Sequence, residues 1–142
     1  MAIARGAGTE IIRTIHLEAV ADTAKPLIYG VRHHIYTVLS VVCFAEGLNA
    51  DTDWISMYLT GYDANAGTAQ QPLYIFKQDM SVAQTFVWND KFSFNGYEPV
   101  DFTGPVDGYA KQDAIADQLV SGDSNGQILY IDAEHSTDNF DI

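Results

Sequence analysis

Short segments in which apolar and polar residues alternate recur along the chain, and residues that favour turns separate them. The clearest segment is His33–Phe44, which reads HHIYTVLSVVCF and is rich in β-branched and aromatic residues. A helical period fits such a segment poorly, because β-branched side chains are restricted in a helix. Both faces of the extended segment are largely apolar, so we expect His33–Phe44 to be a central strand that is covered on both sides. This pattern limits the chain to a β-rich fold.

Further strands are predicted wherever alternation over apolar residues returns. Glu10–Val20 places Ile11, Ile15 and Leu17 on one face of an extended chain, and it therefore predicts a strand. Asp63–Gln71 is small and polar and predicts a loop. The remaining strands are expected over residues 27–31, 54–62, 73–76, 82–88, 91–94, 126–133 and 140–142.

The stretch QTFVWNDKFSFNGYE, from Gln84 to Glu98, contains two pairs of turn-forming residues. Asn89 and Asp90 tolerate positive φ, so we expect them to close a tight hairpin. That hairpin would set Phe86 and Trp88 opposite Phe92 and Phe94. The second pair, Asn95-Gly96, is expected to end a strand, because Pro99 interrupts any return strand.

The helical signal lies in residues 109–120, where Ala110, Ala114, Ile115 and Leu119 share one face of a helix. Together the segments predict seven to nine strands, and no βαβ rhythm is present. We therefore predict an all-β fold, an antiparallel β-sandwich or jelly roll with one short helix. Residues 1–10 are expected to form an extended N-terminal arm, and residues 11–142 a single sandwich domain.

Acidic residues dominate the charge, with 19 Asp and Glu against 7 Lys and Arg and a net charge of −12. Nucleic-acid binding depends on clustered basic residues, and basic segments also attract anionic membranes. We therefore expect neither nucleic acid nor membrane as a direct partner. A cationic surface or a divalent cation would suit this charge, and so would a purely solubilising role. Cys43 is the sole cysteine and is expected to be a small core residue.

No motif predicts catalysis, a cofactor or a metal. His33 and His34 are adjacent, so their side chains would point to opposite faces of a strand and could not chelate one ion. Loop carboxylates that could serve Ca²⁺ occur at Asp51, Asp53, Asp138 and Asp141, without EF-hand spacing. The chain has no G-x-S-x-G nucleophile motif, and its glycines near Arg5 lack the Lys-Ser/Thr of a P-loop. We predict that the protein is not an enzyme.

Aromatic residues leave two hypotheses open. They form either the core of the fold or a platform on which sugars stack, and we prefer the core. The full set is Tyr58, Tyr62, Phe86, Trp88, Phe92, Phe94 and Tyr97. A carbohydrate-binding module would use Trp54, Tyr58 or Trp88.

The segment Met80–Glu98, with Ile75 ahead of it, resembles a motif of small structural proteins of tailed bacteriophages of the marine-phage type. The opening RGAGTEIIR, from Arg5 to Arg13, is similar to the openings of such proteins. The late strand 127–132 with its acidic turn extends the resemblance, which covers about half the chain, and residues 101–126 are an insertion relative to it.

The resemblance implies a virion structural protein, most simply a decoration or cement protein on the phage capsid surface, made in the host cytoplasm. Its implied partner is the major capsid protein, and the protein would itself be a homo-oligomer. The implied contact residues are Arg5, Gly6, Gly8, Glu10 and Arg13. A tail, fibre or head-to-tail adaptor component is the alternative.

Overall fold

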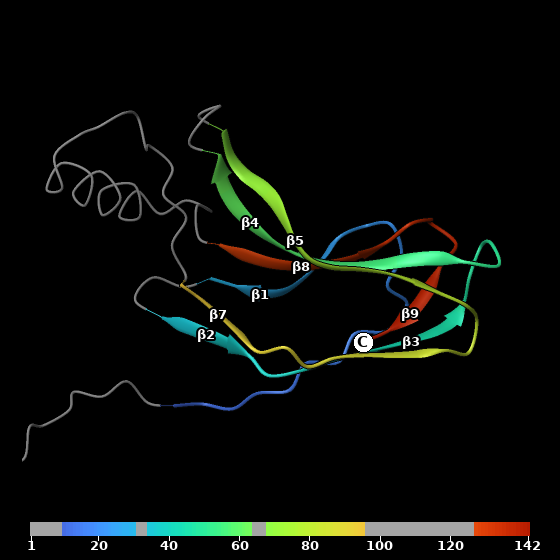
Figure 1. Ribbon diagram of the computed structural model, residues 1–142, viewed down its shortest axis with the longest axis horizontal. Helices are drawn as coiled ribbons and strands as arrows, with labels where there is room; N and C mark the ends of the chain where they lie inside the picture. Colours follow the sequence, from blue (N-terminus) through green and yellow to red (C-terminus); the bar gives the residue numbers. More distant parts are fainter. Residues whose placement is uncertain (1–9, 31–33, 64–67, 96–126) are drawn as a thin grey trace, which may run out of the picture.

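All regular elements in the described part of the chain are β-strands (Figure 1). The computed structural model describes residues 10–30, 34–63, 68–95 and 127–142. The strands are β1 Lys25–Tyr29, β2 Ile35–Val38, β3 Val41–Gly47, β4 Asp53–Asp63, β5 Thr68–Met80, β6 Thr85–Trp88, β7 Phe92–Asn95, β8 Ile128–Ala133 and β9 Asn139–Asp141. The all-β prediction is confirmed for these residues. They contain no helix with the length and apolar character that crossing a membrane requires.

Several predictions fall on residues outside these ranges. They are the helix over residues 109–120, the turn residue Gly96, the first histidine of the His33-His34 pair, and the arm residues Arg5, Gly6 and Gly8. These stay predictions.

The strands form three antiparallel sheets. The first has the order β1-β8-β4-β5, the second pairs β2 with β7, and the third has the order β6-β3-β9. In Figure 1 the four-stranded sheet lies along one side of the molecule, and the two smaller sheets lie along the other. Side chains from all three sheets contribute to one buried cluster.

Strand β4 organises the four-stranded sheet because it pairs with β5 on one side and with β8 on the other. Its alternate residues Ile55, Met57 and Leu59 are buried, as the alternation in the sequence predicts. The predicted loop Asp63–Gln71 is wrong at both ends, because Asp63 pairs with Thr68 and residues 68–71 belong to β5, whereas residues 64–67 lie outside the described residues. Strand β5 passes through Pro72, which an edge strand tolerates because one row of its backbone groups is not needed for a ladder.

The single strand predicted over His33–Phe44 is wrong. The chain breaks at Leu39 and Ser40, and β2 and β3 belong to different sheets. Buried side chains are Val38 before the break and Val41 after it, so the buried face shifts from even to odd positions across the break. The expectation of cover on both faces also fails for β3, where Val42 is 49% exposed.

The hairpin predicted at Asn89 and Asp90 is also wrong, because the strands on either side of this turn do not pair with each other. Strand β6 pairs with β3, and β7 pairs with β2, so Asn89-Asp90 links two sheets. The pair β2–β7 ends on one side of the break at Leu39-Ser40, with Val38 opposite Phe92. The pair β3–β6 begins on the other side, with Val41 opposite Trp88. Long-range pairing therefore overrides the local turn preference.

The core lies between the sheets. Its fully buried members include Cys43 from β3, Ile55 and Met57 from β4, Ile131 from β8 and Phe140 from β9. Burial raises the pKa of the Cys43 thiol to about 12, because the charged thiolate is poorly solvated there. A thiol with this pKa is inert at neutral pH, and the core role predicted for Cys43 is confirmed.

The strand predicted over Glu10–Val20 is wrong. In this segment the structure has one isolated bridge, from Val20 to Phe140 of β9. Leu17 also exchanges backbone hydrogen bonds with Ile142, at 3.0 and 2.8 Å. The segment is therefore fixed to β9 at its C-terminal end, whereas Ile11 and Ile12 before it are exposed.

Candidate functional site

Three tyrosines align across the outer face of the four-stranded sheet. In β4, Tyr58 lies between the buried residues Met57 and Leu59, so its side chain is on the opposite face of the sheet from theirs. The strand register places Tyr58 opposite Tyr74 of β5 and opposite Tyr130 of β8. Directly opposed side chains in neighbouring strands are contact neighbours. We call Tyr58, Tyr74 and Tyr130 the tyrosine row.

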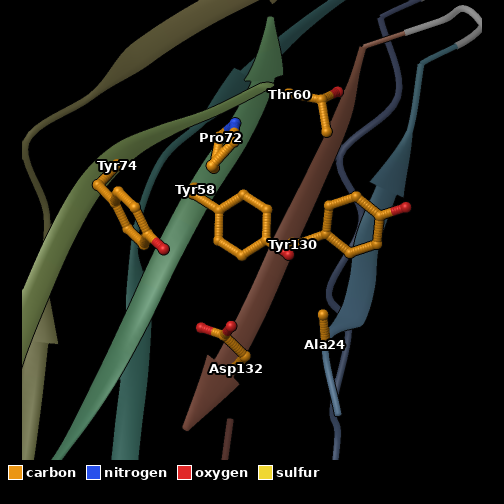
Figure 2. A pocket seen from close by; sticks show the side chains of 7 residues that line it. All are labelled: Ala24, Tyr58, Thr60, Pro72, Tyr74, Tyr130 and Asp132. Carbon is orange, nitrogen blue, oxygen red and sulfur yellow. The ribbon is translucent and has the colours of Figure 1, made fainter. Parts of the chain in front are cut away.

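The rings of the tyrosine row form a platform with one tilted wall. Tyr58 and Tyr130 are close to parallel, with centroids 5.3 Å apart and an interplanar angle of 25°. At this separation the two rings cannot share one plane, so they are stacked with an offset, and Figure 2 views both rings face-on. Tyr74 lies on the other side of Tyr58, with centroids 5.4 Å apart and an angle of 55°.

A shallow depression of about 360 Å³ lies over the row. Its lining consists of Ala24, Tyr58, Thr60, Pro72, Tyr74, Tyr130 and Asp132. Figure 2 shows Thr60 beyond one edge of the two parallel rings and Asp132 beyond the opposite edge. The Thr60 hydroxyl accepts a hydrogen bond from the Ile128 backbone N–H at 2.8 Å, so it already ties β4 to β8. Asp132 is therefore the charged group that the depression offers to a ligand.

Asp132 lies one rung along the sheet from the tyrosine row. Ser56 of β4 is its cross-strand neighbour, and the Ser56 hydroxyl donates a hydrogen bond to the Asp132 carboxylate. Partial burial raises the pKa of Asp132, while the Ser56 hydrogen bond and the charge of Lys77 oppose that rise. Ser56 is fully buried, so its hydroxyl is a structural donor and is not presented as a nucleophile.

The same surroundings keep the Tyr58 hydroxyl protonated. Burial raises the pKa of Tyr58 first, and the negative charge of Asp132 raises it further. Tyr58 is thus a hydrogen-bond donor at neutral pH, whereas Asp132 is an acceptor. The arrangement supplies stacking surface and hydrogen bonds, which are the means of binding a small polar ligand.

The raised pKa of Asp132 has a measurable consequence for stability. A carboxyl group whose pKa is higher in the folded state contributes stability below its unfolded pKa of about 3.9, and this contribution is lost as pH rises through the folded pKa. Asp132→Asn removes the titration. We expect the variant to gain stability over the wild type, by a few tenths of a kcal/mol, as pH rises from about 3.5 to 7.

Urea unfolding at several pH values measures this difference. Asp79→Asn is the matched control, because Asp79 is an exposed carboxylate on β5 of the same sheet. Parallel pH profiles for Asp132→Asn and the wild type would contradict the assignment.

The structure separates the aromatic residues that the sequence singled out. Trp54 lies on the same strand as Tyr58, but the Lys77 ammonium sits 3.9 Å from the centre of its ring. Trp88 contacts Phe76 and Phe92, and Phe94 is buried, so the preferred core role is confirmed for these residues. The sequence did not single out Tyr74 or Tyr130.

Two of the predicted loop carboxylates, Asp53 and Asp138, accept hydrogen bonds from the backbone. Asp53 accepts a hydrogen bond from the Ala50 N–H at 2.8 Å, and its other oxygen lies 3.8 Å from the His135 Nε2 atom. Asp53, Glu134 and His135 bring three possible ligand atoms within 4.8 Å of one another. Asp138 accepts from two backbone N–H groups. Backbone N–H groups therefore partner both buried carboxylates, Asp53 and Asp138.

The predicted partner contacts that lie in the described residues, Glu10 and Arg13, are both exposed on the N-terminal segment. His34 is exposed too, and its ring stacks on Tyr36 at 6.3 Å. His16 contacts the backbone oxygen of Ile142 at 3.0 Å. None of these residues lines the depression over the tyrosine row.

Comparisons with models of protein families, with curated proteins and with solved structures find no match to this chain. Its function is therefore argued from its own geometry.

Proposed function

We propose that the protein is a virion structural protein of a tailed bacteriophage, a decoration or cement protein that attaches to the major capsid protein shell through its N-terminal segment. The observation that carries the proposal is the exposure of three isoleucines before the anchor at Leu17. Ile11 is 64% exposed, Ile12 87% and Ile15 47%. Exposed apolar side chains clustered in one segment are typical of a surface that a partner covers.

The anchor makes the segment suited to attachment. Hydrogen bonds at Leu17 and Val20 hold its C-terminal end to β9, so binding need not order that end. Fully burying one large aliphatic side chain contributes about 1.5–3 kcal/mol, and three of them outweigh the cost of ordering a few residues. An extended segment can also add a strand to an exposed sheet edge of a partner.

Charge distribution supports the same surface. Residues 1–13 contain Arg5, Arg13 and Glu10, which sum to +1. The whole chain carries −12, so the remaining residues carry −13. A weakly basic segment on a strongly acidic body favours contact with an acidic surface, including that of a second copy in a homo-oligomer.

The rest of the fold suits a scaffold. We propose that the three sheets pack as a sandwich, which is supported by the shared core and by the positions of the sheets on opposite sides in Figure 1. A folded body with an exposed apolar segment can attach to a shell without catalysis or a cofactor, so the proposed role includes neither. Nucleic acid and membrane are not partners in this proposal, in keeping with the acidic charge.

Replacing Ile11, Ile12 and Ile15 together by serine tests the attachment. We expect binding to particles that lack the protein to fall at least tenfold, because the exposed apolar surface is removed. Co-sedimentation with such particles measures the change. The matched control replaces Leu73, Val82 and Val87 by serine, since these are also exposed apolar residues. Equal binding by both variants and the wild type would refute attachment through the segment.

Immunogold electron microscopy of whole particles separates the shell from the tail. Label spread over the head supports a decoration protein, whereas label at one vertex or on the tail supports the tail, fibre or adaptor alternative. Particles without label would exclude a place in the virion.

A further inference from the structure

We propose that the tyrosine row binds a neutral carbohydrate, with one sugar ring stacked on Tyr58 beside the offset ring of Tyr130. This inference does not depend on the proposed capsid role. It rests on three observations: two nearly parallel rings stacked with an offset, a tilted third ring beside them, and a carboxylate at the edge of the same depression.

The platform matches the apolar face of a sugar. A pyranose ring presents several C–H groups on one face, and aromatic ring faces carry the partial negative charge that attracts them. Tyr58 and Tyr130 form an offset stack, and Figure 2 shows both rings face-on without overlap, so a ring face beside the offset neighbour is left uncovered for a sugar. Tyr74 is 54% exposed and is tilted toward the platform as a side wall. A stacked ring would therefore be enclosed on two sides.

The polar groups match the hydroxyls at the edge of a sugar. A sugar hydroxyl both donates and accepts, so it can donate to the Asp132 carboxylate and accept from a tyrosine O–H. The Ser56 hydroxyl holds Asp132 in place from below. A tyrosine hydroxyl is protonated at neutral pH, so the depression offers both a donor, Tyr58, and an acceptor, Asp132.

The charge balance of the site favours a neutral ligand over an ion. Lys77 and Asp132 flank Ser56 on the rung next to the tyrosine row. Lys77, whose ammonium lies over Trp54, acts on Asp132 and offsets its charge, so the rung offers a cation little net negative charge. An anion would be repelled by Asp132 and by the acidic chain as a whole.

The first experiment screens the whole protein against an array that holds neutral, sialylated and sulfated oligosaccharides, with tetramethylammonium chloride titrated in parallel. We expect neutral glycans to bind and the charged probes not to. Calorimetric titration of the strongest neutral glycan then gives a dissociation constant for each variant. We expect Tyr58→Leu and Tyr130→Leu to weaken binding at least tenfold and Asp132→Asn to weaken it severalfold.

Tyr29→Leu is the matched control, because Tyr29 is 63% exposed on β1 and does not line the depression. It should bind as the wild type does. Should a leucine variant fail to fold, aromatic NMR signals of the wild type decide instead: shifts confined to the tyrosine row on adding the glycan support the proposal.

Three results would overturn it. They are an array on which no neutral glycan binds, glycan binding that survives Tyr58→Leu in a folded variant, and binding of tetramethylammonium in place of a sugar. If no neutral glycan binds on the array and the leucine variants are destabilised, the tyrosine row serves only the stability of the sheet.

Discussion

Replacing Phe140 with alanine is expected to lower the free energy of unfolding by about 3–5 kcal/mol. Phe140 is the largest fully buried side chain in the described residues, and it lies on β9 opposite Ala45 of β3. Its backbone also exchanges hydrogen bonds with Val20, at 2.9 and 3.1 Å. The substitution therefore leaves a cavity where the third sheet meets the N-terminal segment, and the surrounding strands can collapse into it only partly.

Urea unfolding followed by circular dichroism measures the loss. Phe44→Ala is the matched control on the neighbouring strand, because Phe44 points to the outer face of β3 and is 37% exposed. We expect the control to lose less than half as much stability. If Phe140→Ala does not fold, Phe140→Leu should fold with a loss below about 2 kcal/mol, because most of the volume is kept. Equal losses at positions 44 and 140 would contradict the assigned core.

Asp138→Ala is expected to cost about 2–4 kcal/mol, which is the second large effect. One Asp138 oxygen accepts from the Asn49 N–H at 2.9 Å, and the other accepts from the His135 N–H at 2.8 Å. These two hydrogen bonds join the loop before β4 to the turn before β9. The Asp138 side chain is only 4% exposed, so water cannot easily replace them. Alanine would leave two backbone donors without these acceptors, and bonds to a charged acceptor are stronger than neutral ones.

Asp51→Ala is the control for this variant, because Asp51 is an exposed carboxylate in the same loop as Asn49. Its effect should stay within about 0.5 kcal/mol. Hydrogen exchange provides a second readout, since the amides of Asn49 and His135 should lose protection in Asp138→Ala alone. A stability loss that Asp51→Ala reproduces would indicate general charge effects in place of the two hydrogen bonds.

Strands with one buried face could be predicted from the sequence. In β4, burial of Ile55, Met57 and Leu59 imposes a period of two, and this pattern located the strand to within a residue at each end. Strand β8 ends at Ala133 as predicted but starts at Ile128, two residues later than predicted. Strand β9 was predicted to within a residue at each end.

Strand partners could not be predicted in the same way. Alternation over residues 33–44 indicates extended chain, but it does not say that the chain changes sheet at Leu39 and Ser40. Asn89-Asp90 has the composition of a hairpin turn, yet its flanking strands gain more by pairing with β2 and β3. A local pattern contains no information about these distant partners.

The tyrosine row shows the same limit at the candidate site. Tyr58, Tyr74 and Tyr130 come from three strands, and their alignment depends on the register of each pair. A register shift between Met57 and Tyr58 enters that alignment, and it leaves no mark in the sequence. Stacking chemistry was foreseeable at Tyr58, but its two partners required the structure.

The bridge between Val20 and Phe140 also sets an order of events during synthesis. The third sheet has β9 at one edge, so it stays incomplete until residues 139–141 have left the ribosome. Until then β3 presents one unpaired edge, and the isoleucines ahead of Val20 are tethered to nothing. A nascent chain in this state exposes a strand edge that can pair with another chain, until β9 closes the sheet.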